Sequence, residues 1–484
     1  MNTIKSLKPT SLWEIFHELT QIPRPSKKEE KAAAWAKAFG TSLGLETIVD
    51  SAGNVIIRKP ASPGMENLMG VVLQGHLDMV PQKNSDKKHD FEKDPIETVV
   101  DGEWVKANGT TLGADNGIGV AAAMAVLKDK TLTHGPLEVL LTIDEETGMT
   151  GAFELKSGLL KGDILLNLDS EDEGELYIGC AGGMNTTGTL KYAEESFPSG
   201  MLAFKVSVTG LKGGHSGLDI NLGRGNANKI MNRFLWAAQN LDLRISSLEG
   251  GSLRNAIPRE SFAVVVIPSA NKEKLVALVT ECQEMFSLEF ATPDQGVKIE
   301  AVTTEMPAKV MEASAQKNLI KVVYGIPNAA MRMSPEIPDI VETSTNLAIV
   351  KAEKGEIKIQ CLLRSSVDSA KFSLGHMTQS VMELGGMEVV HNGTYPGWRP
   401  NVNSVILKTM KDVYLKKYGK TPEVKVIHAG LECGIIGAAY PKMELISFGP
   451  TIRYPHSPDE KVNIATVEKF YNFLVETLAA IPKK

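Results

Sequence analysis

The chain has 484 residues, of which 43% are hydrophobic and 23% are charged, values typical of a folded globular protein. Its 52 basic and 58 acidic residues give a net charge of −6, and no dense basic run offers a surface for nucleic acid or anionic lipid. Because one hydrophobic core usually stops growing below this length, we expect two domains and neither a nucleic-acid nor a membrane partner.

The amino-terminal residues predict an amphipathic helix. Leu12, Ile15, Phe16 and Leu19 recur at helical spacing, and the stretch lacks the continuous apolar core of a signal peptide. Nowhere does an apolar run approach the roughly 20 residues that cross a bilayer. The four cysteines are scattered and form no C-x-x-C pair, which suits ordinary buried thiols in a reducing compartment. A cytoplasmic location is therefore expected.

From about residue 69 to 180, short apolar runs alternate with helical patterns, which predicts an α/β fold with a largely parallel sheet. The strand-like runs are "MGVVLQ", "PLEVLLTI" and "DILLNLD", and the helical run is "GIGVAAAMAVLKD". A similar pattern returns near the carboxyl end, where "VILKTMKDVYLKKY" and "IATVEKFYNFLVETLAAI" are helical and "MELISFG" is strand-like.

The middle of the chain has a different pattern. Residues 201–210 alternate like a strand with one solvated face, and the order strand, helix, strand, strand, helix runs over 201–290 and again over 297–385, closing with a strand. This predicts an internally duplicated α+β insert. We expect residues 1–190 and 394–484 to form a three-layer αβα domain with a mostly parallel twisted sheet, and 191–393 to form two α+β subunits of about 90–100 residues.

Each core-like run of the α/β part ends in a possible metal ligand or acid/base group. Binding sites in open α/β sheets form outside the carboxyl ends of the strands, so these side chains are expected to converge. They are His76 and Asp78 after "VVLQ", Asp115 in "TTLGADNGIG", Glu145 and Glu146 in "VLLTIDEETG", Asp169 in "ILLNLDSEDEG", and His456 in "ISFGPTIRYPHSPDE".

Taken singly, these residues have structural interpretations as well. Asp115 could cap the following helix, Glu145 and Glu146 could form a solvated charge run, and His456 could be an ordinary surface histidine. Taken together, several carboxylates and two histidines in one cleft would repel or stay protonated unless cations neutralise them. Two divalent ions are therefore expected, with zinc as the first choice and cobalt or manganese as alternatives.

The blocks "GHLDMV", "TTLGADNGIG", "EETG", "LDSEDEGE", "GGHSG" and "YPHSPDE" resemble the signature blocks of the M20 family of dinuclear zinc peptidases. The resemblance spans nearly the whole chain. It extends to a dipeptidase subgroup through "GTTLGADNGIG", "LKGGHSG", "LRNAIPRE", "TYPGW" and "IHAGLECG". It implies a metal-dependent dipeptidase that hydrolyses unblocked dipeptides, including Xaa-His, with residues 191–393 as a lid and dimerisation domain of a homodimer.

The resemblance also implies roles for the strand-end residues. Asp115 would bridge the two ions, and its peptide bond to Asn116 would be cis. Gly148, two residues after the ligand glutamate, makes Glu145 the general base and leaves Asp144 outside the site. Asp78 would hydrogen-bond the imidazole of His76 or its neighbours. The implied ligands are His76, Asp115 and Asp169 for one ion and Asp115, Glu146 and His456 for the other.

Four further residues are implied by the resemblance. His215 of "LKGGHSG" would polarise the scissile carbonyl, although it could instead cap a turn of the insert. Asn255 and Arg364 would contact the substrate, with Arg364 gripping a terminal carboxylate. Glu432 could hold the free amino group of the substrate or be a structural glutamate.

Two other functions remain open from the sequence. An N-acyl amino-acid deacylase would share the metal site but bind a substrate without a free amino group. A non-catalytic, metal-stabilised interaction protein would keep the ligands and lack the base, and the presence of Glu145 argues against it.

Overall fold

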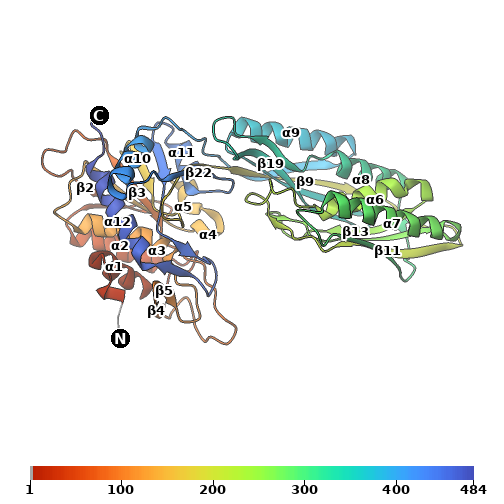
Figure 1. Ribbon diagram of the computed structural model, residues 1–484, viewed down its shortest axis with the longest axis horizontal. Coiled ribbons are helices and arrows are strands. Elements are labelled where there is room, and N and C mark those ends of the chain that lie inside the picture. Colours follow the sequence, from red (N-terminus) through yellow and green to blue (C-terminus); the bar gives the residue numbers. More distant parts are fainter. Residues whose placement is uncertain (1–3) are drawn as a thin grey trace. The chain divides into compact units, whose positions relative to one another are not determined.

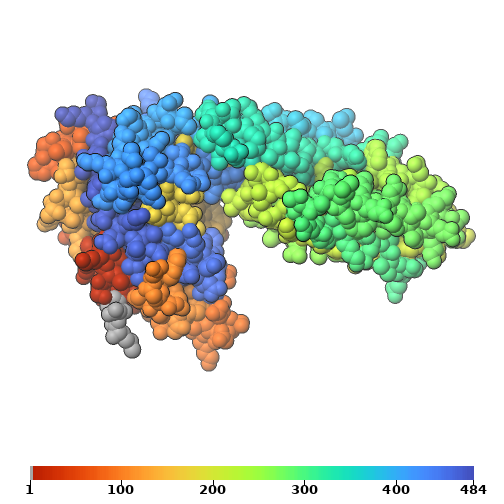
Figure 2. Space-filling model, in the orientation of Figure 1, coloured from red at the N-terminus to blue at the C-terminus, as the bar shows by residue number. Residues whose placement is uncertain are grey.

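The computed structural model describes residues 4–484, and the chain divides into two compact units. The first contains the amino-terminal segment up to Gly179 together with residues 398–426 and 431–484, and the second contains residues 180–397 and 427–430. In Figure 1 the first unit carries both red and dark blue elements, whereas the second runs from yellow through green to light blue. Figure 2 shows orange and blue segments together on the surface of the first unit, so early and late parts of the chain build it jointly.

An eight-stranded sheet forms the centre of the first unit, in the order β1-β2-β6-β3-β7-β23-β8-β22. The four inner strands β6, β3, β7 and β23 are parallel, and β1, β2 and β8 pair antiparallel to their neighbours. The bounds are β1 Glu46–Val49, β2 Val55–Lys59, β3 Val71–His76, β6 Leu137–Thr142, β7 Ile164–Asn167, β8 Glu175–Cys180, β22 Glu423–Ile427 and β23 Glu444–Ser447.

Every residue of β3, β6 and β7 is buried, so both faces of the sheet are covered. Helix α3 packs on β3, α2 on β1 and β2, and α10 and α11 on β23, while α12 lies beside α3 and α10. This confirms the expected α/β layers with a mostly parallel sheet. The bounds are α1 Thr10–Thr20, α2 Glu30–Ser42, α3 Ala114–Lys128, α10 Val405–Tyr418, α11 Glu432–Ala439 and α12 Ile464–Ala479.

Smaller elements complete this unit. Leu12, Ile15, Phe16 and Leu19 are buried on one side of α1, which packs against α3, as their spacing predicts. An antiparallel sheet β24-β25-β5-β4 joins an early hairpin to the carboxyl-terminal segment. The bounds are β4 Thr98–Asp101, β5 Trp104–Ala107, β24 Ile452–Arg453, β25 Lys461–Asn463, α4 Glu145–Gly148 and α5 Thr150–Glu154.

The second unit is built on one long antiparallel sheet in the order β16-β11-β15-β13-β19-β20-β9-β21, with β18 paired to β19. Helices α6, α7, α8 and α9 pack against it and supply much of its buried core. The bounds are β9 Gly182–Lys191, β11 Met201–Thr209, α6 Ala227–Ala237, β13 Arg244–Gly250, β15 Ser261–Pro268, α7 Lys272–Glu289, β16 Lys298–Thr303, α8 Ala313–Gly325, β18 Ala329–Met333, β19 Val341–Glu353, β20 Glu356–Ser365, α9 Asp368–Leu384 and β21 Glu388–Tyr395.

The strand order shows the internal duplication. Strands β16-β11-β15-β13 are mirrored by β21-β9-β20-β19, and the two halves meet where β13 pairs antiparallel with β19. The sequence pattern predicts that the second repeat starts near residue 297, and this prediction is wrong. Strand β16 closes the first repeat, and β9 opens the second although it precedes the first repeat in the chain. Since β9 pairs along its length with β20, the sheet of the second unit begins at Gly182 and not after residue 190.

Two shorter ladders accompany the long sheet: β10 (Glu194–Glu195) with β17 (Val310–Met311), and β12 (Gly214–His215) with β14 (Ala256–Ile257). All four cysteines are buried and none is in a disulfide. Within residues 4–484, no helix combines the length and apolar character that spanning a membrane requires.

Candidate metal centre

The side chains singled out at strand ends meet at one edge of the parallel sheet. His76 is the last residue of β3, Glu145 opens α4 shortly after β6, and Asp169 follows β7 by two residues. Parallel strands present their carboxyl ends at the same edge, so three distant segments deliver side chains to one place. Asp115 joins them from the first turn of α3.

His76, Asp115 and Asp169 form the first group. His76 Nε2 lies 3.2 Å from Asp115 Oδ1 and 3.3 Å from Asp169 Oδ1. The side chains are 1%, 12% and 9% exposed, so the group is almost entirely shielded from solvent. One ligand atom from each residue lies within 4.8 Å of the other two, which is compatible with a shared ion.

Asp115, Glu146 and His456 form the second group. His456 Nε2 lies 3.2 Å from Asp115 Oδ2 and 3.0 Å from Glu146 Oε2. Asp115 thus directs one carboxylate oxygen to each group. The side chain of His456 is 52% exposed, whereas Glu146 is 5% exposed, so this group faces the solvent on the histidine side.

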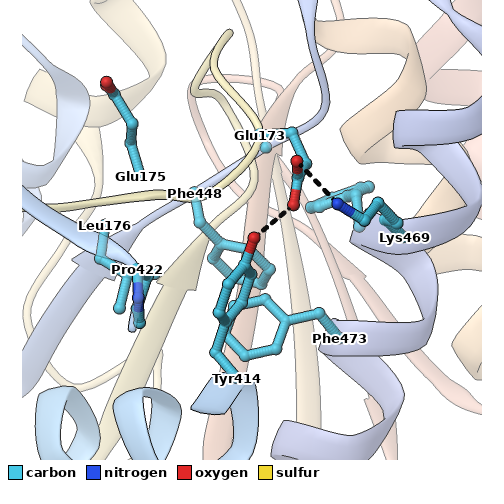
Figure 3. Close-up of a pocket in the computed structure, with 11 residues that line it drawn as sticks. Glu173, Glu175, Leu176, Tyr414, Pro422, Phe448, Lys469 and Phe473 are labelled. Carbon is cyan, nitrogen blue, oxygen red and sulfur yellow. Dashed lines mark hydrogen bonds and ion pairs between the residues drawn. The ribbon is translucent and has the colours of Figure 1, made fainter. Parts of the chain in front are cut away.

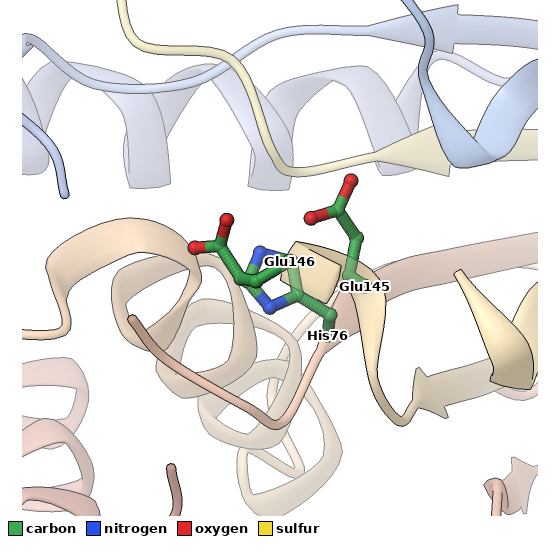
Figure 4. Close-up of side chains that lie close together, drawn as sticks. All are labelled: His76, Glu145 and Glu146. Carbon is green, nitrogen blue, oxygen red and sulfur yellow. The ribbon is translucent and has the colours of Figure 1, made fainter. Parts of the chain in front are cut away.

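Glu145 lies beside the two groups. Figure 4 shows the side chains of Glu145 and Glu146 next to the imidazole of His76, and a ligand atom of each of the three lies within 4.8 Å of the others. Glu146 is the member that contacts His456. The third consecutive acid, Asp144, accepts hydrogen bonds from the hydroxyls of Thr147 and Thr150 and does not join the histidines.

The donor set fits two divalent ions. Two ligands bound at about 2.1 Å in a tetrahedron lie about 3.4 Å apart, close to the nitrogen to oxygen distances of 3.0 to 3.3 Å in both groups. Oε1 of Glu146 is buried and has no hydrogen-bond partner among residues 4–484. Imidazole and carboxylate donors without cysteine suit a catalytic zinc, cobalt or manganese site.

The electrostatics of the site also call for cations. Burial raises the pKa of Asp169 to about 8 and that of Glu171 to about 8, and nearby carboxylates add to both shifts. Burial likewise raises the pKa of Glu145 well above its ordinary value, and Asp169 and Glu432 add to it. Several acids cannot all ionise in a dry site without positive charge, and a pair of divalent ions would supply it.

Asp78 contacts both His76 and the start of α4. Its Oδ1 lies 3.3 Å from His76 Nδ1 and accepts the Glu145 amide at 3.0 Å, while Oδ2 accepts the Glu146 amide at 3.2 Å. Burial opposes ionisation of Asp78, but His76, the Glu145 amide and the Ser26 hydroxyl lower its pKa to about 2. One carboxylate therefore orients both the imidazole of His76 and the start of α4.

The loop that carries Asp115 is held by Glu460 and Asn116. Both carboxylate oxygens of Glu460 accept backbone amides of residues 112–115 at 2.7 to 3.2 Å. The peptide bond from Asp115 to Asn116 is cis, as expected. The side-chain Nδ2 of Asn116 donates to the Leu168 carbonyl at 2.6 Å, which ties this loop to the one that carries Asp169.

The loop after β7 is anchored on a small cavity lined by Phe448, Phe473 and other residues (Figure 3). Tyr414 of α10 donates to Glu173 at 2.6 Å, and Lys469 of α12 pairs with the same carboxylate at 3.1 Å. These bonds fasten the segment that begins with Asp169 to two helices of the layer below. Four aromatic side chains, Tyr414, Phe448, Phe470 and Phe473, form part of the lining of the cavity.

Glu432, at the start of α11, is 1% exposed and lies under the site. Its Oε2 accepts from Gln74 at 2.6 Å and Thr142 at 2.8 Å, and Asn167 in turn donates to Gln74 at 2.5 Å. The two bonds at Oε2 favour the carboxylate form of Glu432, although burial raises its pKa to about 7. Oε1 is buried and has no hydrogen-bond partner among residues 4–484.

His215, Asn255 and Arg364 belong to the second unit. Nδ1 of His215 accepts the amides of Gly217 and Leu218 at 3.2 and 3.1 Å, so the residue does cap a turn. An accepting Nδ1 places the proton of the neutral ring on Nε2. Burial and Arg364 lower the pKa of His215, which favours this neutral form. His215 is thus set as a hydrogen-bond donor through Nε2.

Arg364 is 5% exposed and donates to the Tyr395 hydroxyl at 3.0 Å. Its Nε has no hydrogen-bond partner in the described part of the chain. Asn255 is exposed in the turn just before β14, and its carbonyl accepts the Ser216 amide at 2.8 Å. His428 is a neighbour that the sequence did not single out, and burial, Arg364 and His215 lower its pKa to about 3.

A third acidic group is already satisfied by the protein. Glu29, Asp78 and Asp144 lie together and are buried. Glu29 accepts the amides of Lys27 and Asp144 at 2.8 and 3.0 Å, and the other two carboxylates accept the bonds described above. This group fixes loop geometry. Among the buried acids that hold the loops of the site, Glu460 is the one that lies in a quoted sequence block, "YPHSPDE", four residues after His456.

Comparison with known proteins agrees with this geometry. The model of peptidase family M20/M25/M40 matches residues 72–480. The chain is 46% identical to the cytosol non-specific dipeptidase of Escherichia coli strain K12, over 100% of both sequences. The crystal structure of aminoacylhistidine dipeptidase from Vibrio alginolyticus gives a TM-score of 0.96 at 49% identity and covers 100% of this chain and 99% of that one.

A more distant structure shares the fold alone. Aminopeptidase PepT from Bacillus cereus gives a TM-score of 0.58 at 16% identity, covering 98% of this chain and 99% of that one. The family match takes in all five candidate metal ligands, His76, Asp115, Glu146, Asp169 and His456. On this match and the relative that aligns over its full length, the chain belongs to peptidase family M20/M25/M40.

Proposed function

We propose that this protein is a metal-dependent dipeptidase that hydrolyses the peptide bond of unblocked dipeptides, including those that end in histidine. The observation that carries the proposal is the carboxylate of Asp115 reaching His76 with one oxygen and His456 with the other. The names of the two relatives, a cytosol non-specific dipeptidase and an aminoacylhistidine dipeptidase, support the substrate class.

His76, Asp115 and Asp169 would hold one ion, and Asp115, Glu146 and His456 the other. When bound, two divalent ions lower the pKa of water and polarise the scissile carbonyl. Glu145 takes the proton of the attacking water and passes it to the leaving amine, which balances the hydrolysis. Its raised pKa, caused first by burial, suits a group that must both accept and donate a proton.

His215 would donate from Nε2 to the oxygen of the scissile carbonyl as negative charge develops there. The support is the turn that occupies Nδ1 with two amides and leaves Nε2 as the donor. A neutral imidazole donates one hydrogen bond here and needs no change of protonation during the reaction. Capping a turn and serving as a donor are therefore compatible roles of the same ring.

The two ends of a dipeptide carry opposite charges, and the chain offers a group for each. Arg364 would bind the terminal carboxylate, since it is a buried guanidinium that donates to the hydroxyl of Tyr395 and keeps its Nε without a partner in residues 4–484. Asn255 would contact the substrate as well. Glu432 would bind the terminal ammonium through Oε1, the oxygen that Gln74 and Thr142 leave open. Recognition of both ends would restrict the enzyme to short substrates.

The remaining properties are proposals from the family resemblance. Zinc is the first choice of metal, with cobalt or manganese as alternatives. The second unit would serve as the lid and dimerisation domain, residues 191–393 by the sequence boundaries, in a homodimer. The name of the Escherichia coli relative supports a cytosolic location. Metal analysis and a mass measurement in solution test the metal and the oligomer.

Hydrolysis of alanyl-histidine with and without a chelator tests the proposed function. A dipeptidase cleaves the free dipeptide, loses activity on chelation and recovers it with zinc, cobalt or manganese. N-acetyl-alanine and acetyl-alanyl-histidine are the comparison substrates, and preference for these blocked compounds would identify a deacylase. A protein that binds two ions per chain and cleaves none of the three is the non-catalytic alternative.

A further inference from the structure

The short segment Arg24–Ser26 lies against the end of β3. Pro25 and Met79 form a parallel bridge, the Met79 amide donates to the Arg24 carbonyl at 3.1 Å, and the Ser26 amide donates to the Met79 carbonyl at 3.3 Å. The segment therefore forms an isolated parallel bridge beside the residues that follow His76 and Asp78. It precedes residues 72–480, the part of the chain that the family model matches.

The guanidinium of Arg24 joins two of the loops that carry metal ligands. Nη1 donates to the carbonyls of Leu77 and Asp78, each at 2.8 Å, and Nη2 donates to the carbonyl of Gly113 at 2.6 Å. Leu77 directly follows His76, and Gly113 comes two residues before Asp115. Arg24 is 1% exposed, so these bonds are shielded from water.

The fit around this guanidinium is close. A Cβ atom on Gly113 would lie 2.6 Å from Arg24 Nη2, and one on Gly117 would lie 2.8 Å from it. Gly113 also has a φ of 70°, which favours glycine. A planar guanidinium can bond several carbonyls in fixed directions, whereas the single ammonium of lysine cannot reproduce that fork.

The same loops are held from other sides. Glu460 accepts the amides of residues 112–115, so that loop is fixed through its amides by Glu460 and through a carbonyl by Arg24. Ser26 donates its hydroxyl to Asp78 Oδ2 at 2.8 Å, next to the Glu146 amide on the same oxygen. Arg24 thus bonds backbone within one or two residues of His76 and Asp115, and Ser26 bonds the Asp78 carboxylate that also accepts the Glu146 amide.

We propose that Arg24, assisted by Ser26, is a positioning residue that sets the distance between His76 and Asp115 and so tunes the affinity of the metal centre. The inference rests on the proposed metal site and goes beyond it, because neither residue is a ligand or touches the substrate. Changes of groups that orient metal ligands typically cost about 10- to 100-fold in metal affinity.

The test compares Arg24→Lys with Arg58→Lys. Arg58 is a matched control in the same unit, because it pairs with Glu46 at 2.6 Å and with Glu138 at 2.9 Å. Glu138 lies near the start of β6, whereas the candidate metal centre lies beyond the other end of this strand, which is Thr142. Each protein is stripped of metal and titrated with cobalt against a competing chelator. The visible absorption of bound cobalt and the melting temperature of the metal-free protein are recorded as well.

We expect Arg24→Lys to weaken cobalt binding about 10- to 100-fold and to alter the cobalt spectrum, while Arg58→Lys keeps both at the wild-type values. Wild-type affinity and spectrum in Arg24→Lys would overturn the inference, as would an equal loss of affinity in Arg58→Lys. If Arg24→Lys does not fold, Ser26→Ala decides, with weaker affinity expected and an unchanged spectrum and affinity counting against the inference. Failure of the wild-type protein to bind cobalt would instead refute the metal site itself.

Discussion

The carboxylate of Asp78 accepts the backbone amide of Glu145 at 3.0 Å while it lies 3.3 Å from the imidazole of His76. The group that orients a proposed ligand thus also orients the proposed base. If both assignments hold, catalysis and metal binding are coupled through this one side chain. A change at Asp78 should therefore lower both metal affinity and turnover. A change at a proposed ligand should first lower metal affinity, and a change at the proposed base should first lower turnover.

Asp78→Asn places an amide group where two oxygens now accept hydrogen bonds. Its NH₂ would face a backbone N–H, because the amides of Glu145 and Glu146 each point at one oxygen. We expect metal affinity to fall about 10- to 100-fold, together with turnover of alanyl-histidine at saturating metal. Titration with cobalt and an assay at high metal measure the two. Full turnover once the metal is saturating would contradict the coupling.

Glu145→Gln removes the proposed base and leaves the proposed metal ligands in place. We expect turnover to fall by about 10² to 10⁴, with metal content unchanged, because this is the usual contribution of general acid/base transfer. Glu146→Gln is the paired variant and is expected to lose metal. Elemental analysis and turnover of alanyl-histidine check both. If Glu145→Gln lost metal and Glu146→Gln kept it, the two assignments would have to be exchanged.

Arg364→Lys tests recognition of the terminal carboxylate. A hydrogen bond to a charged group contributes roughly 1.5 to 3 kcal/mol, so kcat/KM for alanyl-histidine should fall roughly 10- to 150-fold. Alanyl-histidine amide has no such carboxylate and should lose little. The ratio of kcat/KM for the two substrates is the measurement. An equal loss on both substrates would assign Arg364 to the structure of the second unit.

Glu432→Gln tests recognition of the free amino group. The variant keeps a side chain that can bond Gln74 and Thr142, but it no longer offers a negative charge at Oε1. We expect kcat/KM for alanyl-histidine to fall roughly 10- to 150-fold, with no further loss for the acetylated dipeptide. The preference for the unblocked substrate should shrink. An unchanged preference would leave Glu432 as a structural residue.

The lowered pKa of His428 predicts that stability depends on pH. Burial and Arg364 lower its pKa from 6.5 to about 3, so between these values the unfolded chain binds more protons than the folded one. The free energy of unfolding should fall as the pH falls from 6.5 toward 3, by up to about 1.4 kcal/mol per pH unit from this group. Denaturation of the metal-free protein between about pH 4 and 7 measures this. In His428→Gln the free energy of unfolding should change less with pH than in the wild-type protein. Equal slopes in the two proteins would contradict this prediction.

Much of the fold and of the site could be predicted from sequence because the signals are local. The buried run before His76 predicts β3, and strand ends of a parallel sheet converge by geometry alone. Helices such as α10 and α12 have the expected bounds within a few residues. The roles of Glu145, His215 and Glu432 stay predictions, since the distances around these side chains are compatible with the roles without testing them.

Contacts between residues far apart in the chain could not be predicted, because they leave no local pattern in the sequence. Arg24 bonds carbonyls 53 and 89 positions away, and a bond to a backbone carbonyl asks for no particular residue at the other end. Nothing in the spacing of "IPRPS" could therefore reveal it. The boundary predicted at residue 190 puts β9 in the wrong domain for a similar reason. Its partners, β20 and β21, follow more than 160 residues later, and hydrophobic periodicity says nothing about which strand pairs with which.

The position of β23 between β7 and β8 has a consequence for biosynthesis. During translation, β7 and β8 leave the ribosome long before the residues of β23, 444–447, that lie between them in the finished sheet. The nascent chain must therefore carry unpaired strand edges until synthesis is nearly complete, a state prone to aggregation that chaperones commonly shield. Since His456 and Glu460 emerge later still, a ribosome-bound or prematurely terminated chain is not expected to acquire activity against peptides in the surrounding medium.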